Sequence, residues 1–185
     1  MILRLLVAMV MTQLVCEVAF SANGKTAQPM QLTRVVAVDN SLYEEHCGAC
    51  HFAFQPGLLP AESWAALLGG LGDHFGENAE LPSAEAEAVS SYLLDNASDQ
   101  VVTALGKLIS GSIPPMKTVL RITETPYFKL KHQLLESVLT DSIKKDIPYS
   151  NCIACHPRAQ LGEYHEDETH IPGFADWKKW HIQYQ

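Results

Sequence analysis

Two short stretches decide the fold, Cys47-Gly48-Ala49-Cys50-His51 and Cys152-Ile153-Ala154-Cys155-His156. Both have the pattern C-x-x-C-H, which is the attachment motif of c-type haem. On a helical turn, residues at i, i+3 and i+4 share a face, so two thiols and one imidazole point the same way. The thiols can form thioethers to the porphyrin edge while the imidazole reaches the iron. We therefore predict two covalently bound haem c groups, attached through Cys47, Cys50, Cys152 and Cys155, with His51 and His156 as iron ligands.

Other uses of paired cysteines fit this chain less well. A thioredoxin-like redox pair needs no histidine after the second cysteine, and it expects a βαβ context that the surrounding pattern lacks. A structural zinc site could join both pairs of cysteines. Their first cysteines, however, stand 105 residues apart (152 minus 47), far beyond the usual ligand spacing.

Composition narrows the class of protein. The chain has 185 residues, of which 47% are hydrophobic and 18% charged, as expected for one globular domain or two small ones. Its formal net charge of -8 argues against a nucleic-acid binder, because such a protein needs a basic face to neutralise phosphates. Basic proteins or small carriers are the better expected partners.

The N-terminus has the form of an export signal. Arg4 precedes an apolar run over residues 5–15, and the small-residue site Ala19-Phe20-Ser21 follows. The run is shorter than the roughly 20 residues of a membrane-spanning helix, although an uncleaved anchor stays the alternative. We expect residues 1–21 to be a signal peptide and the mature chain, which has no other spanning stretch, to work outside the cytoplasm.

Helical periodicity dominates the remaining sequence, so we predict a mainly α protein with little β structure. Helices are expected to begin at a capping box of Ser41 and Glu44, at Pro60, at about Ser83, and at the N-cap Thr125 before Pro126. Residues 97–120 contain Gly111, Pro114 and Pro115, which break regular structure, and we place an interdomain connection there. The predicted haem domains span residues 22–118 and 119–185.

The second axial ligand of each iron decides whether small molecules can bind there. His74 follows Leu71 by three residues, so a continued helix would place it on the apolar face. His132 follows Phe128 by one helical turn and is the candidate ligand of the second haem. Met116 is the rival ligand, because many cytochromes c bring a methionine to the iron from a proline-rich loop.

The other histidines have surface contexts. His165 and His170 flank the acidic run Glu166-Asp167-Glu168, which suggests that both are solvated. His46 and His181 are most simply surface residues as well.

Several motifs together resemble the diheme cytochrome c family of bacterial periplasmic electron carriers. Besides the two attachment motifs, they are Pro56-Gly57-Leu58-Leu59-Pro60, Ser63-Trp64, Asp73-His74-Phe75-Gly76, Arg121-Ile122-Thr123-Glu124-Thr125-Pro126 and residues 128–132. The similarity covers roughly residues 43–173. Residues 97–118, and the tail from Phe174 with Trp177 and Trp180, depart from the family pattern.

The resemblance implies bis-histidine ligation, which pairs His51 with His74 and His156 with His132. It also implies a class I cytochrome c-like N-terminal domain and periplasmic location. The implied partners are an oxygen-binding c-type haem protein and a membrane b-type cytochrome. We expect an electron-transfer protein and not an enzyme. The alternative is a small haem enzyme, of the peroxidase or nitrogen-oxide reductase type, with one open iron and a distal acid/base group.

Overall fold

The computed structural model describes residues 32–140, 143 and 146–175. Within them the regular secondary structure is helical, with isolated β-bridges in place of strands, so the prediction of a mainly α fold is confirmed. The α-helices are α1 (Ser41–Cys47), α2 (Ala61–Leu68), α3 (Ser83–Asp95), α4 (Ala104–Ser112), α5 (Pro126–His132) and α6 (Leu135–Val138). The predicted signal peptide, Trp177, Trp180 and His181 lie outside the described residues.

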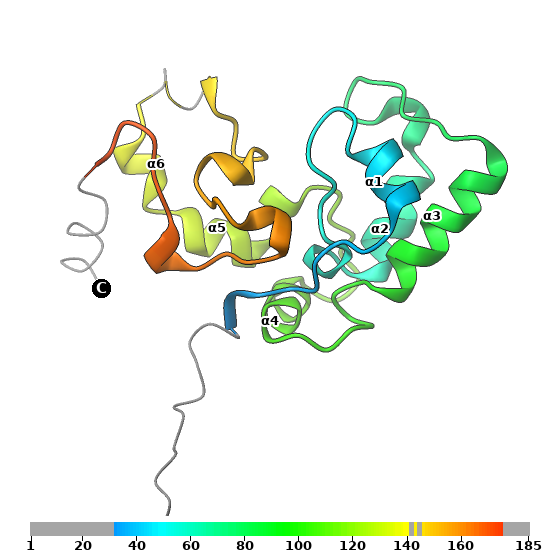
Figure 1. Cartoon of the computed structure of the whole chain (residues 1–185). Coiled ribbons are helices and arrows are strands. Elements are labelled where there is room, and N and C mark those ends of the chain that lie inside the picture. Colours follow the sequence, from blue (N-terminus) through cyan, green and yellow to red (C-terminus); the bar gives the residue numbers. More distant parts are fainter. Residues whose placement is uncertain (1–31, 141–142, 144–145, 176–185) are drawn as a thin grey trace, which may run out of the picture.

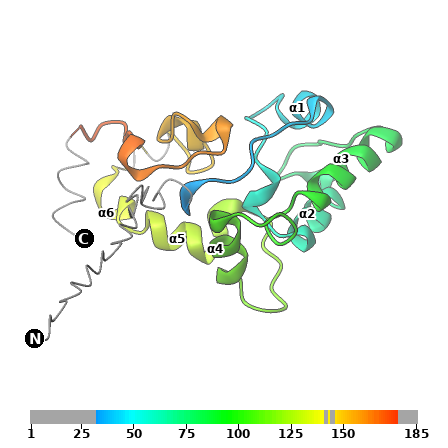
Figure 2. The same ribbon diagram turned by 60° about the horizontal axis from the view of Figure 1, so that its bottom comes forward.

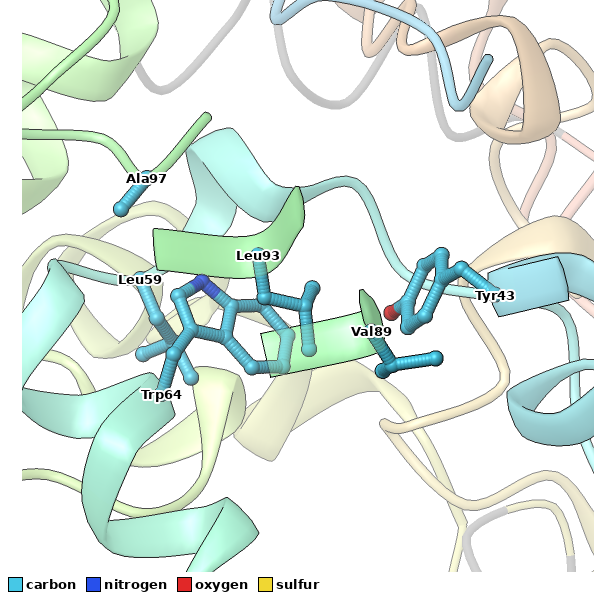
Figure 3. Packing of buried hydrophobic residues seen from close by; sticks show 6 residues of the cluster. All are labelled: Tyr43, Leu59, Trp64, Val89, Leu93 and Ala97. Atoms are coloured by element: carbon cyan, nitrogen blue, oxygen red, sulfur yellow. The ribbon is translucent and has the colours of Figure 1, made fainter. Parts of the chain in front are cut away.

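Helices α1, α2 and α3 form a first lobe over residues 38–100, on one side of the molecule (Figure 1). Both α1 and α2 pack on α3. The core of this lobe consists of Tyr43, Leu59, Trp64, Val89, Leu93 and Ala97 (Figure 3). The indole N–H of Trp64 donates a 2.7 Å hydrogen bond to the carbonyl of Pro56, so the buried ring has no unpaired polar atom.

Helices α2 and α3 begin within one residue of the predicted Pro60 and Ser83 but have no side-chain cap, whereas side chains cap α1 and α5. The predicted cap at Thr125 is confirmed, because its Oγ1 accepts a hydrogen bond from the N–H of Phe128 at 3.2 Å. The predicted capping box at Ser41 is wrong by one residue. Asn40 has extended backbone angles and its Oδ1 accepts from the N–H of Tyr43 at 2.9 Å, so Asn40 is the N-cap of α1.

Helix α4 lies where the sequence suggested only a connection. Thr103 caps it, since its Oγ1 accepts from the N–H of Gly106 at 3.0 Å. Leu105 and Ile109, one turn apart, are both buried and hold the helix against α5. Gly106 suits this packing, because a Cβ there would meet the carbonyl of Ser98 at 3.2 Å.

Residues 101–175 form a second lobe, with α5 and α6 beside the segment that carries the second motif (Figures 1 and 2). The predicted single helix after Thr125 is divided here into α5 and α6. Gln133 and Leu134 between them keep right-handed helical angles, with φ of -57° and -72°. The chain therefore keeps its helical course between α5 and α6, although the pattern of helical hydrogen bonds is interrupted there.

Buried contacts tie the second lobe to the N-terminal part of the chain. The N–H of Val35 donates to the carbonyl of Gly162 at 3.0 Å. Gly162 has φ of +73°, and a Cβ there would lie 2.4 Å from the Val35 oxygen, so glycine is required. Gln55, with no exposed surface, donates from Nε2 to the carbonyl of Ala159 at 2.7 Å and accepts from the hydroxyl of Tyr164 at 2.6 Å. The predicted domain boundary at residue 118 stays a prediction, and the hydrogen bonds just described join residues on either side of it.

Candidate metal centres

The first site lies in the first lobe, at the C-terminal end of α1. Cys47 is the last residue of α1, and Cys50 and His51 follow it and are exposed. The ring of His51 lies 6.4 Å from the ring of His74, centroid to centroid, and the two planes are inclined by 30°. The structure therefore brings together the two histidines that were expected to share the first iron.

His74 reaches this position by a turn and not by the expected continuation of the helix. Helix α2 ends at Leu68, and a 3-10 turn over Leu71–Asp73 follows. The N–H of His74 donates to the carbonyl of Glu77 at 2.7 Å, while Asp73 Oδ1 accepts from the N–H of Gly76 at 2.9 Å. Gly76 has φ of +103°, which closes the turn that presents the imidazole.

The second site lies between α5 and the second motif. His132 is the last residue of α5, and the motif begins with a 3-10 helix over Cys152–Ala154. The ring centroids of His132 and His156 are 6.2 Å apart and the ring planes are inclined by 76°. The ring of Phe128 stacks on His132 at 3.8 Å with an interplanar angle of 12°, which fixes the orientation of that imidazole.

One large apolar cavity contains all the expected groups of the second site. Its cavity volume is about 170 Å³. Cys152, Cys155, His132 and His156 all line it. The rest of its wall is mostly aliphatic and aromatic, with Leu105, Ile109, Phe128, Leu135, Leu139 and Tyr164 among the lining residues. A broad apolar prosthetic group fits such a cavity.

The spacing of each histidine pair fits a metal ion between the rings. A bond from imidazole nitrogen to a first-row metal is about 2 Å long, so two opposed rings on one ion have centroids about 6 Å apart. The observed 6.4 Å and 6.2 Å agree with this value. In the described part of the chain, no group of three or more His, Cys, Asp or Glu side chains is placed to hold a metal ion. Each pair could therefore supply two ligands, as a haem requires, and the four motif cysteines are not gathered into one metal-binding cluster.

Hydrogen bonds at Nδ1 set the tautomers of three of these imidazoles. His51 Nδ1 donates to the carbonyl of Phe52 at 2.9 Å, and His132 Nδ1 donates to the carbonyl of Phe128 at 2.8 Å. His156 Nδ1 lies 3.3 Å from the hydroxyl oxygen of Thr169. A proton on Nδ1 leaves the lone pair on Nε2, which is the state of a metal ligand.

Electrostatics also favours the neutral imidazole. Burial, together with the neighbouring ring of His132, lowers the pKa of His156 to about 4. Burial lowers the pKa of His132, and burial with the nearby ring of His51 lowers that of His74. Since a ligand must lose its proton to bind a metal, these groups are poised for binding at neutral pH.

No disulfide joins the four motif cysteines, and three of them lie where burial disfavours a charged sulfur. Burial raises the pKa of Cys152 to about 12 and also raises the pKa of Cys47 and of Cys155. A zinc or redox site needs thiolates, whereas a thioether sulfur is neutral. The surroundings of Cys152 therefore suit thioether formation better than a charged sulfur.

The other candidate ligands have surroundings of a different kind. Met116 is fully exposed, at 101% of its reference surface. His170 is exposed as expected, but the expectation that His165 is solvated is wrong. It is 7% exposed, and its Nδ1 lies 2.7 Å from Thr33 Oγ1, a partner 132 residues away that no local pattern reveals. His46 is half-buried, with Nε2 2.8 Å from Glu85 Oε2.

Aromatic residues around the sites have different roles. Phe128 lines the second cavity, whereas Trp64 belongs to the packed core of the first lobe. Phe75 is adjacent to His74, and the guanidinium of Arg121 lies over its ring, 3.6 Å from the centroid. Tyr164 and Thr169 beside His156 were not anticipated, because their roles depend on contacts across the fold and not on any motif.

The chain is similar to proteins of one known family. The family model described as dihaem cytochrome c matches residues 43–164. The diheme cytochrome c from Rhodobacter sphaeroides is 36% identical with a TM-score of 0.61, and the alignment covers 70% of this chain and 100% of that one. The diheme cytochrome type c from Shewanella baltica is 32% identical with a TM-score of 0.55, covering 75% and 97%. No curated protein matches the chain.

Among the described residues, no helix has the length and apolar character needed to cross a membrane.

Proposed function

The chain belongs to the dihaem cytochrome c family, and we propose that it carries single electrons between redox proteins of the periplasm. Membership of this family gives it two covalently bound haem c groups. When bound, these groups supply one-electron chemistry between ferric and ferrous iron. The four cysteines of the C-x-x-C-H motifs are the proposed attachment points.

One observation carries this proposal, namely the closeness of His51 to His74 and of His132 to His156. In the proposed arrangement the two imidazoles of each pair would together hold one haem iron. No position is then left for a substrate, so the chain's task is transfer between proteins and not chemical conversion of a bound molecule. Histidine on both sides also favours lower potentials than a methionine ligand would.

The charge of the first lobe supports a basic partner at the first site. Residues 41–100 contain no Lys or Arg but ten acidic residues, Glu44, Glu45, Glu62, Asp73, Glu77, Glu80, Glu85, Glu87, Asp95 and Asp99. All except Glu85 are exposed. Such a one-signed field raises the rate of encounter with an oppositely charged protein, and salt screens it. We propose that a basic redox protein docks beside His51 and His74.

The family resemblance suggests the identities of the partners. An oxygen-binding c-type haem protein as acceptor and a membrane b-type cytochrome as donor remain proposals for this chain. So does the removal of residues 1–21 on export, because that segment lies outside the described residues.

Reoxidation kinetics test the proposed function. The fully reduced protein should be reoxidised rapidly by a small basic cytochrome c of higher potential, and only slowly by hydrogen peroxide or nitrite. Stopped-flow absorbance measures all three reactions on the same preparation. Rapid multiple turnover with peroxide or nitrite would instead support the haem-enzyme alternative, which needs an open iron and a distal acid/base group.

A further inference from the structure

Residues 165–170 form a strap that touches both halves of the second site. Glu166 of the strap forms an ion pair with Lys131, the neighbour of His132 on α5. On the other side, the N–H of His170 donates to the carbonyl of Cys155 at 2.8 Å. The strap thus spans from the helix that carries His132 to the motif that carries His156.

Thr169 is the strap residue that contacts an expected iron ligand. Its Oγ1 is 2.9 Å from the carbonyl oxygen of His165 and 3.3 Å from Nδ1 of His156. A carbonyl can only accept, so the hydroxyl proton points to His165. The hydroxyl oxygen is then left to accept the Nδ1 proton of His156. The two hydrogen bonds run in the same direction, from His156 through Thr169 to the carbonyl of His165, so each polarises the other.

This arrangement differs from those of the other expected iron ligands that have a bonded Nδ1. His51 and His132 donate to the backbone carbonyls of Phe52 and Phe128. His156 bonds to a side chain instead. Thr169 can therefore be substituted without altering the backbone that carries either ligand of the second site.

The hydrogen bond has a chemical consequence at the metal. Donation from Nδ1 makes the opposite nitrogen a more basic ligand, and a more basic ligand favours ferric over ferrous iron. We propose that Thr169 is a positioning residue that fixes the tautomer and ring plane of His156 and lowers the reduction potential of the second haem. This inference rests on the proposed bis-histidine function.

The test compares Thr169→Val with Thr169→Ser in the full-length protein that carries both haems. Valine keeps the shape and removes the hydroxyl, whereas serine keeps the hydroxyl. Each protein is titrated potentiometrically and followed by EPR, which separates the two haems by their different ring angles of 30° and 76°. Thr118→Val serves as control, because Thr118 also has an engaged hydroxyl, donated to Glu62 in the first lobe.

We expect Thr169→Val to raise the potential of the second haem alone. A change of up to about tenfold in its ferric-to-ferrous ratio at fixed potential fits the usual effect of such partners, and tenfold is about 59 mV for one electron. Thr169→Ser and Thr118→Val should match the wild-type protein. Loss of low-spin character at the second haem in Thr169→Val but not in Thr169→Ser would also support the proposal.

Three results would overturn it. They are an unchanged second potential in Thr169→Val, an equal shift of both haems, and identical behaviour of the valine and serine variants. A failure of the proposed function looks different, since the wild-type protein itself would then show a high-spin iron or fewer than two haems before any variant is compared.

Discussion

The imidazole planes of His132 and His156 are inclined by 76°, whereas those of His51 and His74 are inclined by only 30°. The stacked ring of Phe128 and the hydroxyl of Thr169 hold the former pair in this crossed arrangement. We therefore expect the two proposed haem sites to differ in electronic structure, although the proposed ligands have the same chemistry.

This difference predicts two distinct low-spin EPR signals from the ferric protein. Nearly parallel imidazole planes separate the iron d orbitals and give a rhombic signal. Nearly perpendicular planes leave two orbitals almost degenerate and give a highly anisotropic signal. Low-temperature EPR should show both in equal amounts, and a single signal that accounts for both irons would contradict the ring geometry.

His132→Ala should open one iron only. The variant removes one proposed axial ligand from the second site and leaves the pair of His51 and His74 intact. The reduced variant should bind one carbon monoxide per protein, and added imidazole should compete with it. His170→Ala is the matched control, because His170 is exposed and contacts the second motif through its backbone N–H, which alanine keeps. If both variants bind carbon monoxide equally, His132 is not the ligand.

Salt should slow the reaction with a basic partner, and the first lobe should carry the effect. Glu45→Gln combined with Glu77→Gln removes two exposed charges near the first site. Asp146→Asn combined with Asp167→Asn removes two exposed charges from the second lobe. Stopped-flow experiments measure the rate constant for reaction with the basic partner at several ionic strengths. This rate constant should fall less steeply with added salt in the first-lobe double variant than in the second-lobe double variant. Equal slopes would place the docking surface elsewhere.

Tyr164→Phe should destabilise the junction of the lobes. The change leaves Oε1 of the fully buried Gln55 without its 2.6 Å donor, and an unsatisfied buried acceptor costs roughly 1–3 kcal/mol. Tyr92→Phe, which loses a 3.1 Å bond at an exposed position, should cost less. Guanidinium unfolding followed by circular dichroism measures both free energies. Equal losses would show that Gln55 does not depend on Tyr164.

Local patterns predicted the parts of the site that depend on neighbouring residues. The C-x-x-C-H spacing indicates its own chemistry, and the cap Thr125 with Phe128 one turn before His132 correctly placed His132 on the helix that begins at Pro126. The structure places His74 near His51 although the expected continuous helix is absent. The turn that presents it depends on Gly76 and on the end of α2, which helical periodicity alone does not locate.

Distant contacts set the limit of sequence reasoning. His165 is buried because Thr33, 132 residues earlier, meets its ring. Thr169 acts on His156 across 13 residues, and Tyr164 meets Gln55 across 109. Helix α4 was missed because its two glycines, Gly106 and Gly111, disfavour a helix in isolation, while packing of Leu105 and Ile109 against α5 outweighs that preference.

Carbon monoxide binding by the fully reduced, unmodified protein tests the central claim most directly. If imidazole completes the coordination of both irons, the absorption spectrum should remain unchanged when the gas is added at neutral pH. Uptake of one or two equivalents by the native protein would show an open iron, and would contradict the pairing of His51 with His74 or of His156 with His132.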